Sequence, residues 1–420
     1  MISKNKLNLL ALISVQASNA VLPIIIFPYI LKMAGDVLYS KIAVAEVFSI
    51  VVLAIVIYGF EIDGVKKIID AYASKMDLSG VFNQIFFSRL MLMLCSLAVL
   101  PFVYWIYGTE TFNLTLFWML IPLSYVVQNS YFFLALEQNF TLAIVNIISR
   151  VSSILIVILC VQNSVDAFYA PAYIGGCYFV GACITFFILI KSFKVKVNII
   201  SLATCFSTLR NSFHVFISNI SVLLYRDLNV IFLSMITHDA SAIANYSIAE
   251  KFVKSYQAIF RPISQFFFPK VVVSLKNFSA PEKASFWIII KTVRIQIALF
   301  VFSLITLAAG YYFLMFFLPM FNEIVIRYHS ILPLFLIMTG AIFFGIPNFM
   351  LGSVGLNVLN RKHKFAMYVL ITGLLNIIVC SALSELFGAV GAAISFVFAE
   401  FLLLSLVSFT YFRGRDDSRV

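Results

Sequence analysis

The sequence predicts an all-α polytopic membrane protein, with about twelve transmembrane helices arranged in two lobes of six. Hydrophobic residues make up 62% of its 420 residues and charged residues only 11%, whereas a soluble domain carries roughly 25% charged residues. Apolar runs of about 20 residues, long enough to cross a bilayer as a helix, recur along the whole chain. Lys and Arg gather in alternate connections between these runs, as expected of a membrane protein with one fixed orientation.

The apolar runs predict twelve spans. Lys4 and Lys6 precede the first run, which continues to about Leu31. That run is too long for the apolar region of a signal peptide, so we interpret it as a retained transmembrane helix. The spans are expected near 8–31, 42–60, 84–107, 112–135, 140–161, 168–190, 206–236, 241–268, 286–314, 329–350, 365–384 and 387–412.

The basic residues predict the orientation of these spans. With the N-terminus in the cytoplasm, 18 Lys and Arg residues fall in cytoplasmic segments, and only Lys32, Lys41 and Arg327 fall in outer loops. This bias places both termini in the cytoplasm. An even number of spans agrees with this, because it places both termini on the same side of the membrane.

The longest cytoplasmic connection, at about 191–205, divides the spans six and six. We therefore expect an N-terminal lobe over 1–195, a C-terminal lobe over 196–412 and a cytoplasmic tail over 413–420. The sequence VAEVF at 44–48 opens the second span and is echoed by IAEKF at 248–252, which opens the eighth. This echo favours a parallel repeat related by an axis along the membrane normal.

The sequence lacks the motifs that mark several kinds of catalytic, metal-binding and nucleotide-binding site. The six cysteines form no CxxC pair, and the four histidines form no HExxH motif, so we expect neither a catalytic site nor a metal. A phosphate-binding glycine loop of the Walker type is also missing, and we expect no cofactor. The net charge of +11 reflects the cytoplasmic loops rather than a nucleic-acid surface.

Arg150 is a basic residue inside a predicted span. It lies about ten residues, or roughly 15 Å, from the cytoplasmic end of span five, which is near the bilayer midplane. Buried ionisable groups in membranes usually face a cavity or a partner. Arg150 is therefore either a cation that faces a binding cavity or a structural residue that binds backbone carbonyls.

Span eight carries a polar stripe with helical spacing, formed by Glu250, Lys254, Gln257, Arg261 and Gln265. Arg226 and Asp227 in span seven lie at a similar predicted depth. The pairs Arg226–Glu250 and Asp227–Lys254 are both plausible. A network that only pairs charges is the alternative to a ligand-binding stripe, although it leaves Arg150 and Arg261 unmatched.

Acids are scarcer inside the spans. Glu46 lies in span two and Glu400 in span twelve, and each is a candidate proton carrier or helix-pairing residue. The candidates for ion coupling or ion pairing are Glu46, Asp227, Glu250 and Glu400. The surplus of buried cations favours an anionic ligand, and arginine suits phosphate because it binds it bidentately.

Five short motifs, in order along nearly the whole chain, resemble those of the Wzx-type O-antigen flippases, polysaccharide exporters of the MOP superfamily. The first-helix pattern has an L-P, then a P-Y, a basic residue and a glycine. A second motif ends span two, a third covers the turn into span five and ends on an arginine, and two more mark spans eight and twelve. They are LPIIIFPYILKMAG at 22–35, YGF at 58–60, LALEQNFTLAIVNIISR at 134–150, NYSIAEKFVKSYQAIFRPISQFFFPKV at 245–271 and FGAVGAAISFVFAE at 387–400.

The resemblance implies a MATE-like, V-shaped transporter of two six-helix lobes in the bacterial inner membrane. The implied substrate is an undecaprenyl-pyrophosphate-linked oligosaccharide, moved from the cytoplasmic to the periplasmic leaflet by alternating access. Membrane lipid, and the polymerase and chain-length regulator of the same pathway, are the expected partners. Arg150 and the Glu250/Lys251 pair fall on motif positions. Lys32 departs from the pattern, because that position more often holds arginine.

The residues predicted to bind substrate are Arg150, Arg226, Lys251, Lys254 and Arg261. Of these, Arg226, Lys254 and Arg261 rest on stripe and depth alone. Pro23 and Pro28 interrupt the first span and would free the carbonyls of Asn19 and Ile24. We interpret them as a bend and a hinge in a cavity-lining helix.

Other functions remain as alternatives. A multidrug exporter of the same superfamily would need an apolar cavity with acids for cationic drugs, which the basic stripe disfavours. A capsule or exopolysaccharide unit exporter of the same family stays open. A glycan polymerase or ligase would typically carry a large periplasmic loop, whereas the longest outer loop here is near 315–328. A scaffold without transport would leave the buried charges unexplained.

Overall fold

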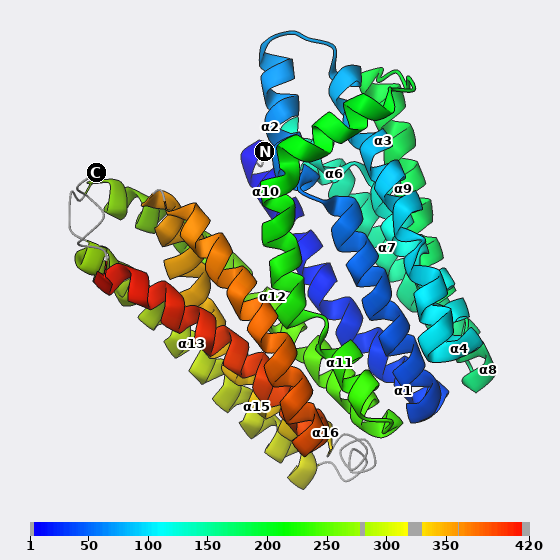
Figure 1. Cartoon of the computed structure of the whole chain (residues 1–420), viewed down its shortest axis with the longest axis vertical. Helices are drawn as coiled ribbons and strands as arrows, with labels where there is room; N and C mark the ends of the chain where they lie inside the picture. Colours follow the sequence, from blue (N-terminus) through cyan, green and yellow to red (C-terminus); the bar gives the residue numbers. More distant parts are fainter. Residues whose placement is uncertain (1–3, 278–281, 318–329, 360, 414–420) are drawn as a thin grey trace. The chain divides into compact units, whose positions relative to one another are not determined.

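A computed structural model of the chain describes residues 4–277, 282–317, 330–359 and 361–413. All the regular elements within these ranges are helical (Figure 1). The chain divides into two compact units, Met1–Leu223 and Leu224–Val420. The predicted all-α membrane fold is confirmed.

Unit 1 contains ten helices in its described part, several of them short pieces of longer runs. They are α1 (Lys4–Ile57), α2 (Phe60–Ala73), α3 (Leu78–Ser96), α4 (Val99–Trp118), α5 (Leu120–Gln128), α6 (Ser130–Ala135), α7 (Asn139–Cys160), α8 (Ser164–Ala167), α9 (Ala170–Phe193) and most of α10 (Leu202–Arg226).

Unit 2 begins inside α10 and continues through helices that are fewer and longer. They are α11 (Asn229–Ile236), α12 (Ala240–Asn277), α13 (Glu282–Phe317), α15 (Ile331–Asn348), the π-helical segment η2 (Phe349–Leu356) and α16 (Lys362–Arg413). Helix α16 packs against α11 and α15, and α12 packs against α13 and α15.

Seven helical stretches in the described ranges are long and apolar enough to cross a membrane, or up to eight if a bent pair at the end of α10 and in α11 counts as one. Two of them are 52 residues long, or about 78 Å, against a hydrocarbon core of about 30 Å. Such stretches accommodate two crossings each. The total of twelve spans remains a prediction.

Glycines interrupt three of the long helices. Gly35 in α1, Gly108 in α4 and Gly388 in α16 have φ of 70°, 77° and 57°, outside the helical range. Only glycine adopts this left-handed region without steric cost, so each marks the place where an apolar run ends and the next begins. The motif that begins at Leu22 therefore ends at a break in the helix.

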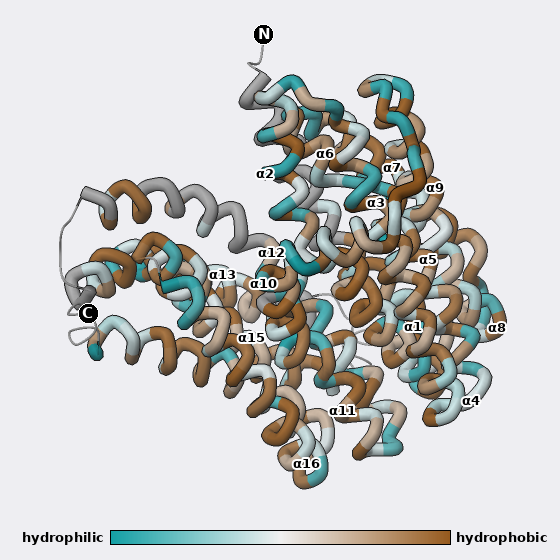
Figure 2. Tube along the Cα trace, turned by 45° about the horizontal axis from the view of Figure 1, so that its top comes forward, coloured by the Kyte–Doolittle hydropathy of each residue, from teal (hydrophilic) through white to brown (hydrophobic). Residues whose placement is uncertain are grey.

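Hydrophobic residues run along the helices, while hydrophilic residues gather at helix ends and turns (Figure 2). The turn between α2 and α3 shows the local reason. The Asp77 side chain accepts a hydrogen bond of 2.9 Å from the backbone N–H of Ser79 and so caps α3. The same bond lowers the pKa of the Asp77 carboxyl.

An aromatic core fills the end of unit 1 at which α2, α3 and α6 meet. Phe60, Phe82, Tyr131, Phe132 and Phe133 are all fully buried there. Gly64 lies beneath the Tyr131 ring, and a Cβ on this glycine would lie 2.7 Å from that ring. The absence of a side chain at Gly64 therefore lets α2 and α6 pack directly against each other.

Candidate functional site

The polar stripe of α12 meets the end of α10 in unit 2. The Lys254 ammonium lies 2.6 Å from the Asp227 carboxylate and 3.1 Å from the Glu250 carboxylate, one turn earlier on α12. The predicted Asp227–Lys254 pair is thus present. The side chains of Lys254 and Asp227 are 27% and 23% exposed, and that of Glu250 is 4% exposed.

The guanidinium of Arg226 donates a hydrogen bond to the amide oxygen of Gln257. The prediction offered Glu250 as a partner of Arg226, and the contact formed is with the next polar residue of the stripe. Glu400 lies within electrostatic reach of Arg226. A Cβ on Gly345 would lie 3.7 Å from both Gln257 and Glu400, so this glycine lies beside both side chains.

Glu400 is buried in α16 and accepts a hydrogen bond of 2.7 Å from the Nδ2 of Asn348 in α15. The same Nδ2 donates to the Glu400 backbone carbonyl at 2.8 Å. One further amide pair crosses unit 2, because the Nδ2 of Asn376 donates to the Oδ1 of Asn229 at 2.8 Å. These contacts join α10, α11, α12, α15 and α16 around one polar cluster.

The charges in this cluster are closely balanced. Two cations, Arg226 and Lys254, meet three acids, Asp227, Glu250 and Glu400. The geometry therefore matches the charge-pairing alternative more closely than an open cationic stripe. Lys251 is half-buried on α12. Arg261 also belongs to α12, but its side chain lies outside the described residues.

Arg150 belongs to unit 1 and lies on α7 with 7% of its surface exposed. Its guanidinium donates to the Ser18 hydroxyl of α1 at 2.7 Å and to the Tyr178 hydroxyl of α9 at 3.4 Å. It also lies 5.8 Å from the centre of the Tyr178 ring. Three helices of unit 1 therefore converge on this cation through hydroxyl groups.

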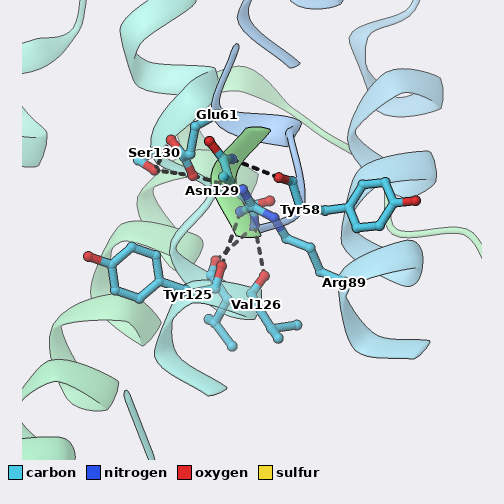
Figure 3. Close-up of polar contacts among 9 residues, drawn as sticks. Tyr58, Glu61, Arg89, Tyr125, Val126, Asn129 and Ser130 are labelled. Atoms are coloured by element: carbon cyan, nitrogen blue, oxygen red, sulfur yellow. Dashed lines mark hydrogen bonds and ion pairs between the residues drawn. The ribbon is translucent and has the colours of Figure 1, made fainter. Parts of the chain in front are cut away.

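A second buried arginine of unit 1, Arg89 on α3, was missed by sequence reasoning (Figure 3). Its side chain is fully buried, and it binds the Glu61 carboxylate at 2.7 Å and the Tyr125 carbonyl at 3.1 Å. The guanidinium also lies 5.3 Å from the centre of the Tyr131 ring. The Ser130 hydroxyl lies within hydrogen-bond distance of both carboxylate oxygens of Glu61, 2.9 Å from Oε1 and 2.8 Å from Oε2.

This cluster lies where two helices of unit 1 are broken. Tyr58, between α1 and α2, and Asn129, between α5 and α6, have φ of 54° and 47°. The break at Asn129 frees carbonyls at the end of α5, and Arg89 and the Asn129 amide bind three of them, those of Tyr125, Val126 and Val127. A signal was available in the sequence, because Arg89 falls inside a predicted span and Glu61 directly follows YGF.

The remaining predicted residues lie in α1. Pro23 and Pro28 are half-buried inside the helix, which continues through both, and the break comes later, at Gly35. Glu46 is half-buried, and Lys32 is exposed. The Tyr29 hydroxyl, next to Pro28, donates to the Val161 carbonyl at 2.7 Å and so ties α1 to the end of α7.

Comparison with known proteins identifies the family to which this chain belongs. The profile of the family described as polysaccharide biosynthesis protein matches residues 6–273, more than half of the chain. The chain belongs to that family. A protein of Escherichia coli (strain K12), named as a proposed O-antigen transporter, is 25% identical over 405 residues and is covered over 95% of both chains. A protein of Shigella dysenteriae with the same name is 24% identical over 272 residues, or 63% of this chain and 67% of that protein.

Solved structures share the fold at low sequence identity. The lipid II flippase MurJ in an inward closed conformation aligns with a TM-score of 0.67 and 16% identity, over 96% of this chain and 87% of that one. An inward-facing multidrug resistance MATE transporter of the MOP superfamily aligns with a TM-score of 0.59 and 11% identity, over 95% and 94%. The resemblance inferred from the motifs is thereby confirmed. These two relatives and these two solved structures are named as transporters or flippases, in agreement with the expectation of a transporter rather than an enzyme.

Proposed function

We propose that the chain is a flippase for polysaccharide units linked to a membrane lipid. In this proposal it moves undecaprenyl-pyrophosphate-linked O-antigen, or a related surface polysaccharide repeat unit, from the cytoplasmic to the periplasmic leaflet of the bacterial inner membrane. Twelve spans, with both termini in the cytoplasm, belong to the same proposal. The observation that carries it is the similarity to a relative named as an O-antigen transporter over 95% of both chains.

Physical chemistry explains why such a substrate needs a protein. A pyrophosphate and a polar glycan cannot cross hydrocarbon unaided, because neither can shed its water without compensating contacts. Arg150 can supply such contacts, since its planar guanidinium matches phosphate and its neighbours are hydroxyl groups that also donate hydrogen bonds. We propose that Arg150 binds the pyrophosphate head group first. Arg226, Lys251 and Arg261 then bind it at a later stage of transport.

Lys254 is suited to a different task, because it is shared by two carboxylates. Protonation of Asp227 or Glu250 would leave Lys254 bound to the other acid, so the network tolerates a change of charge. We therefore assign coupling to a cation gradient to these acids, with Glu400 and Glu46 as further candidates. Alternating access would then follow the protonation of this network.

A strain that lacks its O-antigen flippase provides the test. The intact chain is expected to restore surface O-antigen and to remove the lipid-linked intermediate that accumulates. Arg150→Ala should abolish this rescue while leaving the amount of inserted protein unchanged. Arg150→Lys should restore part of it, because the charge is kept and the bidentate geometry is lost.

Arg210→Ala is the matched control, since it removes an exposed arginine of the same unit. Rescue by Arg150→Ala at the wild-type level would contradict the head-group assignment. If the intact chain fails to clear O-antigen intermediates but clears those of a capsule or exopolysaccharide pathway, the substrate class needs revision. Affinity purification from the rescued strain would test association with the polymerase and the chain-length regulator.

A further inference from the structure

The last turn of α5, in unit 1, presents two polar side chains toward α7. Tyr125 and Gln128 are three residues apart and therefore share one face of the helix. Gln128 donates a hydrogen bond to the Oδ1 of Asn146 on α7. The Tyr125 side chain lies within electrostatic reach of Arg150, one turn further along α7. A polar face of α5 thus meets a polar face of α7, with Gln128 opposite Asn146 and Tyr125 opposite Arg150.

Helix α9 packs against both of these helices and carries Tyr178 between them. A Cβ on Gly175 would lie 2.8 Å from the nearest atom of α5, and a Cβ on Gly181 would overlap a side chain of α7. The two glycines therefore let α9 approach both helices closely. Tyr178 lies midway between them in the sequence, and its hydroxyl accepts a hydrogen bond of 3.4 Å from Arg150.

The backbone at the end of α5 is held from its other side by α3. Arg89 binds the Tyr125 carbonyl at 3.1 Å, and the Tyr125 ring points away from this arginine (Figure 3). Asn129, with φ of 47°, ends α5 directly after Gln128, and its amide binds the Val127 carbonyl at 2.8 Å. The backbone that carries Tyr125 and Gln128 is therefore fixed before any ligand arrives, as a preorganised binding site requires.

Three polar groups of these side chains are open to a ligand. Within the described residues, no hydrogen-bond partner is present for the Tyr125 hydroxyl, the Gln128 Oε1 or the Asn146 Nδ2. All three side chains are half-buried. Polar groups inside a membrane protein are costly unless water or a ligand binds them. We name Gln128 and Asn146 the amide pair, and it leaves an acceptor on Gln128 beside a donor on Asn146.

A donor beside an acceptor is the complement of another amide, whose N–H donates and whose carbonyl accepts. The N-acetyl group of an amino sugar is such an amide, and the hydroxyls of the sugar ring are partners for Tyr125. A carboxylate or a phosphate carries acceptors alone, so it would leave the Gln128 oxygen without a donor. Asn146 lies one turn, or about 6 Å, from Arg150, a span that one sugar ring bridges. The amide pair therefore suits an N-acetylated sugar attached directly to a phosphate at Arg150.

We propose that Tyr125, Gln128 and Asn146 form a subsite in unit 1 for an N-acetylated sugar joined directly to the pyrophosphate that Arg150 binds. The proposal rests on the proposed function and adds to it the chemical group by which the first sugar is recognised. A sugar with a hydroxyl in place of the N-acetyl group leaves part of the amide pair without a partner, and so binds more weakly.

Binding of three matched lipids to the full-length protein in nanodiscs tests the subsite. The probes are undecaprenyl pyrophosphate alone and the same lipid carrying one glucose or one N-acetylglucosamine. The lipid with N-acetylglucosamine is expected to bind about two- to tenfold more tightly than the lipid with glucose, the effect of one hydrogen bond. The lipid without a sugar should bind most weakly.

Variants separate recognition of the sugar from recognition of the phosphate. Asn146→Leu and Gln128→Leu should each remove the difference between the two sugar-bearing lipids. Asn113→Leu, the same change at an exposed position of α4, should preserve it. Arg150→Ala should weaken all three lipids by a similar factor and keep their order. A purely structural role of the amide pair would lower the amount of folded protein without changing the ratio between the lipids.

The comparison of the two sugar-bearing lipids needs no variant. Equal affinity of the unmodified protein for both would overturn the subsite and leave the flippase assignment standing. A difference that persists in both Asn146→Leu and Gln128→Leu would overturn it as well, because the sugar would then be recognised elsewhere. If the unmodified protein binds none of the three lipids, the proposed function fails, and the subsite fails with it.

Discussion

Each unit of the molecule pairs a basic side chain within its helices with carboxylate groups, but the two clusters are built in opposite ways. In unit 1 the side chain of Arg89 is fully buried, and its donors go to Glu61 and to the freed Tyr125 carbonyl. In unit 2 the side chain of Lys254 is 27% exposed and is shared by Asp227 and Glu250. A rigid guanidinium with fixed acceptors suits a brace, whereas a flexible ammonium between two carboxylates suits a part that exchanges partners.

This contrast teaches that burial of the base, rather than charge alone, separates a structural from a working ion pair. A fully buried charge that loses its partner has no water to replace it, so the fold depends on the pair. A charge in contact with water can lose a partner at small cost to stability. Variants of the two clusters should therefore separate folding from transport.

The largest effect on stability is expected from Arg89→Met. Removal of this guanidinium leaves the Tyr125 carbonyl and the Glu61 carboxylate, which is 28% exposed and keeps Ser130, without their charged donor. The loss should cost about 3 kcal/mol. Thermal unfolding of the purified protein and its amount in membranes are the measurements. The double variant Arg89→Met/Glu61→Gln should recover much of the loss, because no unpaired charge remains. An Arg89→Met protein as stable as the wild type would show that this cluster is not a brace.

Lys254→Ala is expected to impair transport more than stability, which is the reverse of the effect expected for Arg89→Met. Lys254 and Asp227 are partly exposed, but Glu250 is 4% exposed and loses its charged partner. The loss of stability should therefore be smaller than that of Arg89→Met without vanishing, while surface glycan display should be lost. The measurements are unfolding temperature and O-antigen display in the flippase-null strain. Equal losses of stability and display would remove the distinction between the two clusters.

The sequence predicted the unit 2 cluster better than the unit 1 cluster for a physical reason. Helical spacing places Glu250, Lys254 and Gln257 on one face of α12, and counting residues from the outer loop placed Asp227 at the same depth. Both inferences need only regular helices. The Asp227–Lys254 pair is the contact that this reasoning yields.

The unit 1 cluster depends on irregular backbone, which a periodic pattern does not describe. Glu61 reaches Ser130 and Arg89 because α1 breaks at Tyr58 and α5 at Asn129, neither of which is a glycine or a proline. Conversely, Pro23 and Pro28 were expected to bend α1, and the non-helical residue is Gly35. Gly35 and Gly108 fall in connections between predicted spans, and Tyr58 lies at the predicted end of span two, whereas the break at Asn129 lies inside a predicted span and was missed.

Two glycines, one in each unit, show how tightly the side chains are packed within that unit. A Cβ at Gly64 in unit 1 would lie 2.7 Å from the Tyr131 ring and 3.0 Å from Ile85, whereas one at Gly345 in unit 2 would lie 3.7 Å from Gln257 and Glu400. Gly64→Ala should therefore destabilise the protein by about 1–3 kcal/mol through overpacking, and Gly345→Ala should fit. Unfolding temperatures of the two alanine variants give the comparison. A greater loss for Gly345→Ala would mean that unit 2 is the more tightly packed unit at these positions.

The smallest effect is expected at the exposed pair Lys41–Glu110 in unit 1, whose side chains are 38% and 61% exposed. Water screens both charges and the pair must order two long side chains, so Lys41→Ala should change stability by about 0–1 kcal/mol. High salt should reduce even this difference, because it screens exposed charges and leaves buried ones nearly unaffected. The unfolding temperatures of Lys41→Ala and Arg89→Met, each measured at low and high salt, compare the salt dependence of the exposed pair with that of the buried arginine. If salt reduced the Arg89→Met effect as strongly as the Lys41→Ala effect, the Arg89 cluster would be open to water and burial would not distinguish the two pairs.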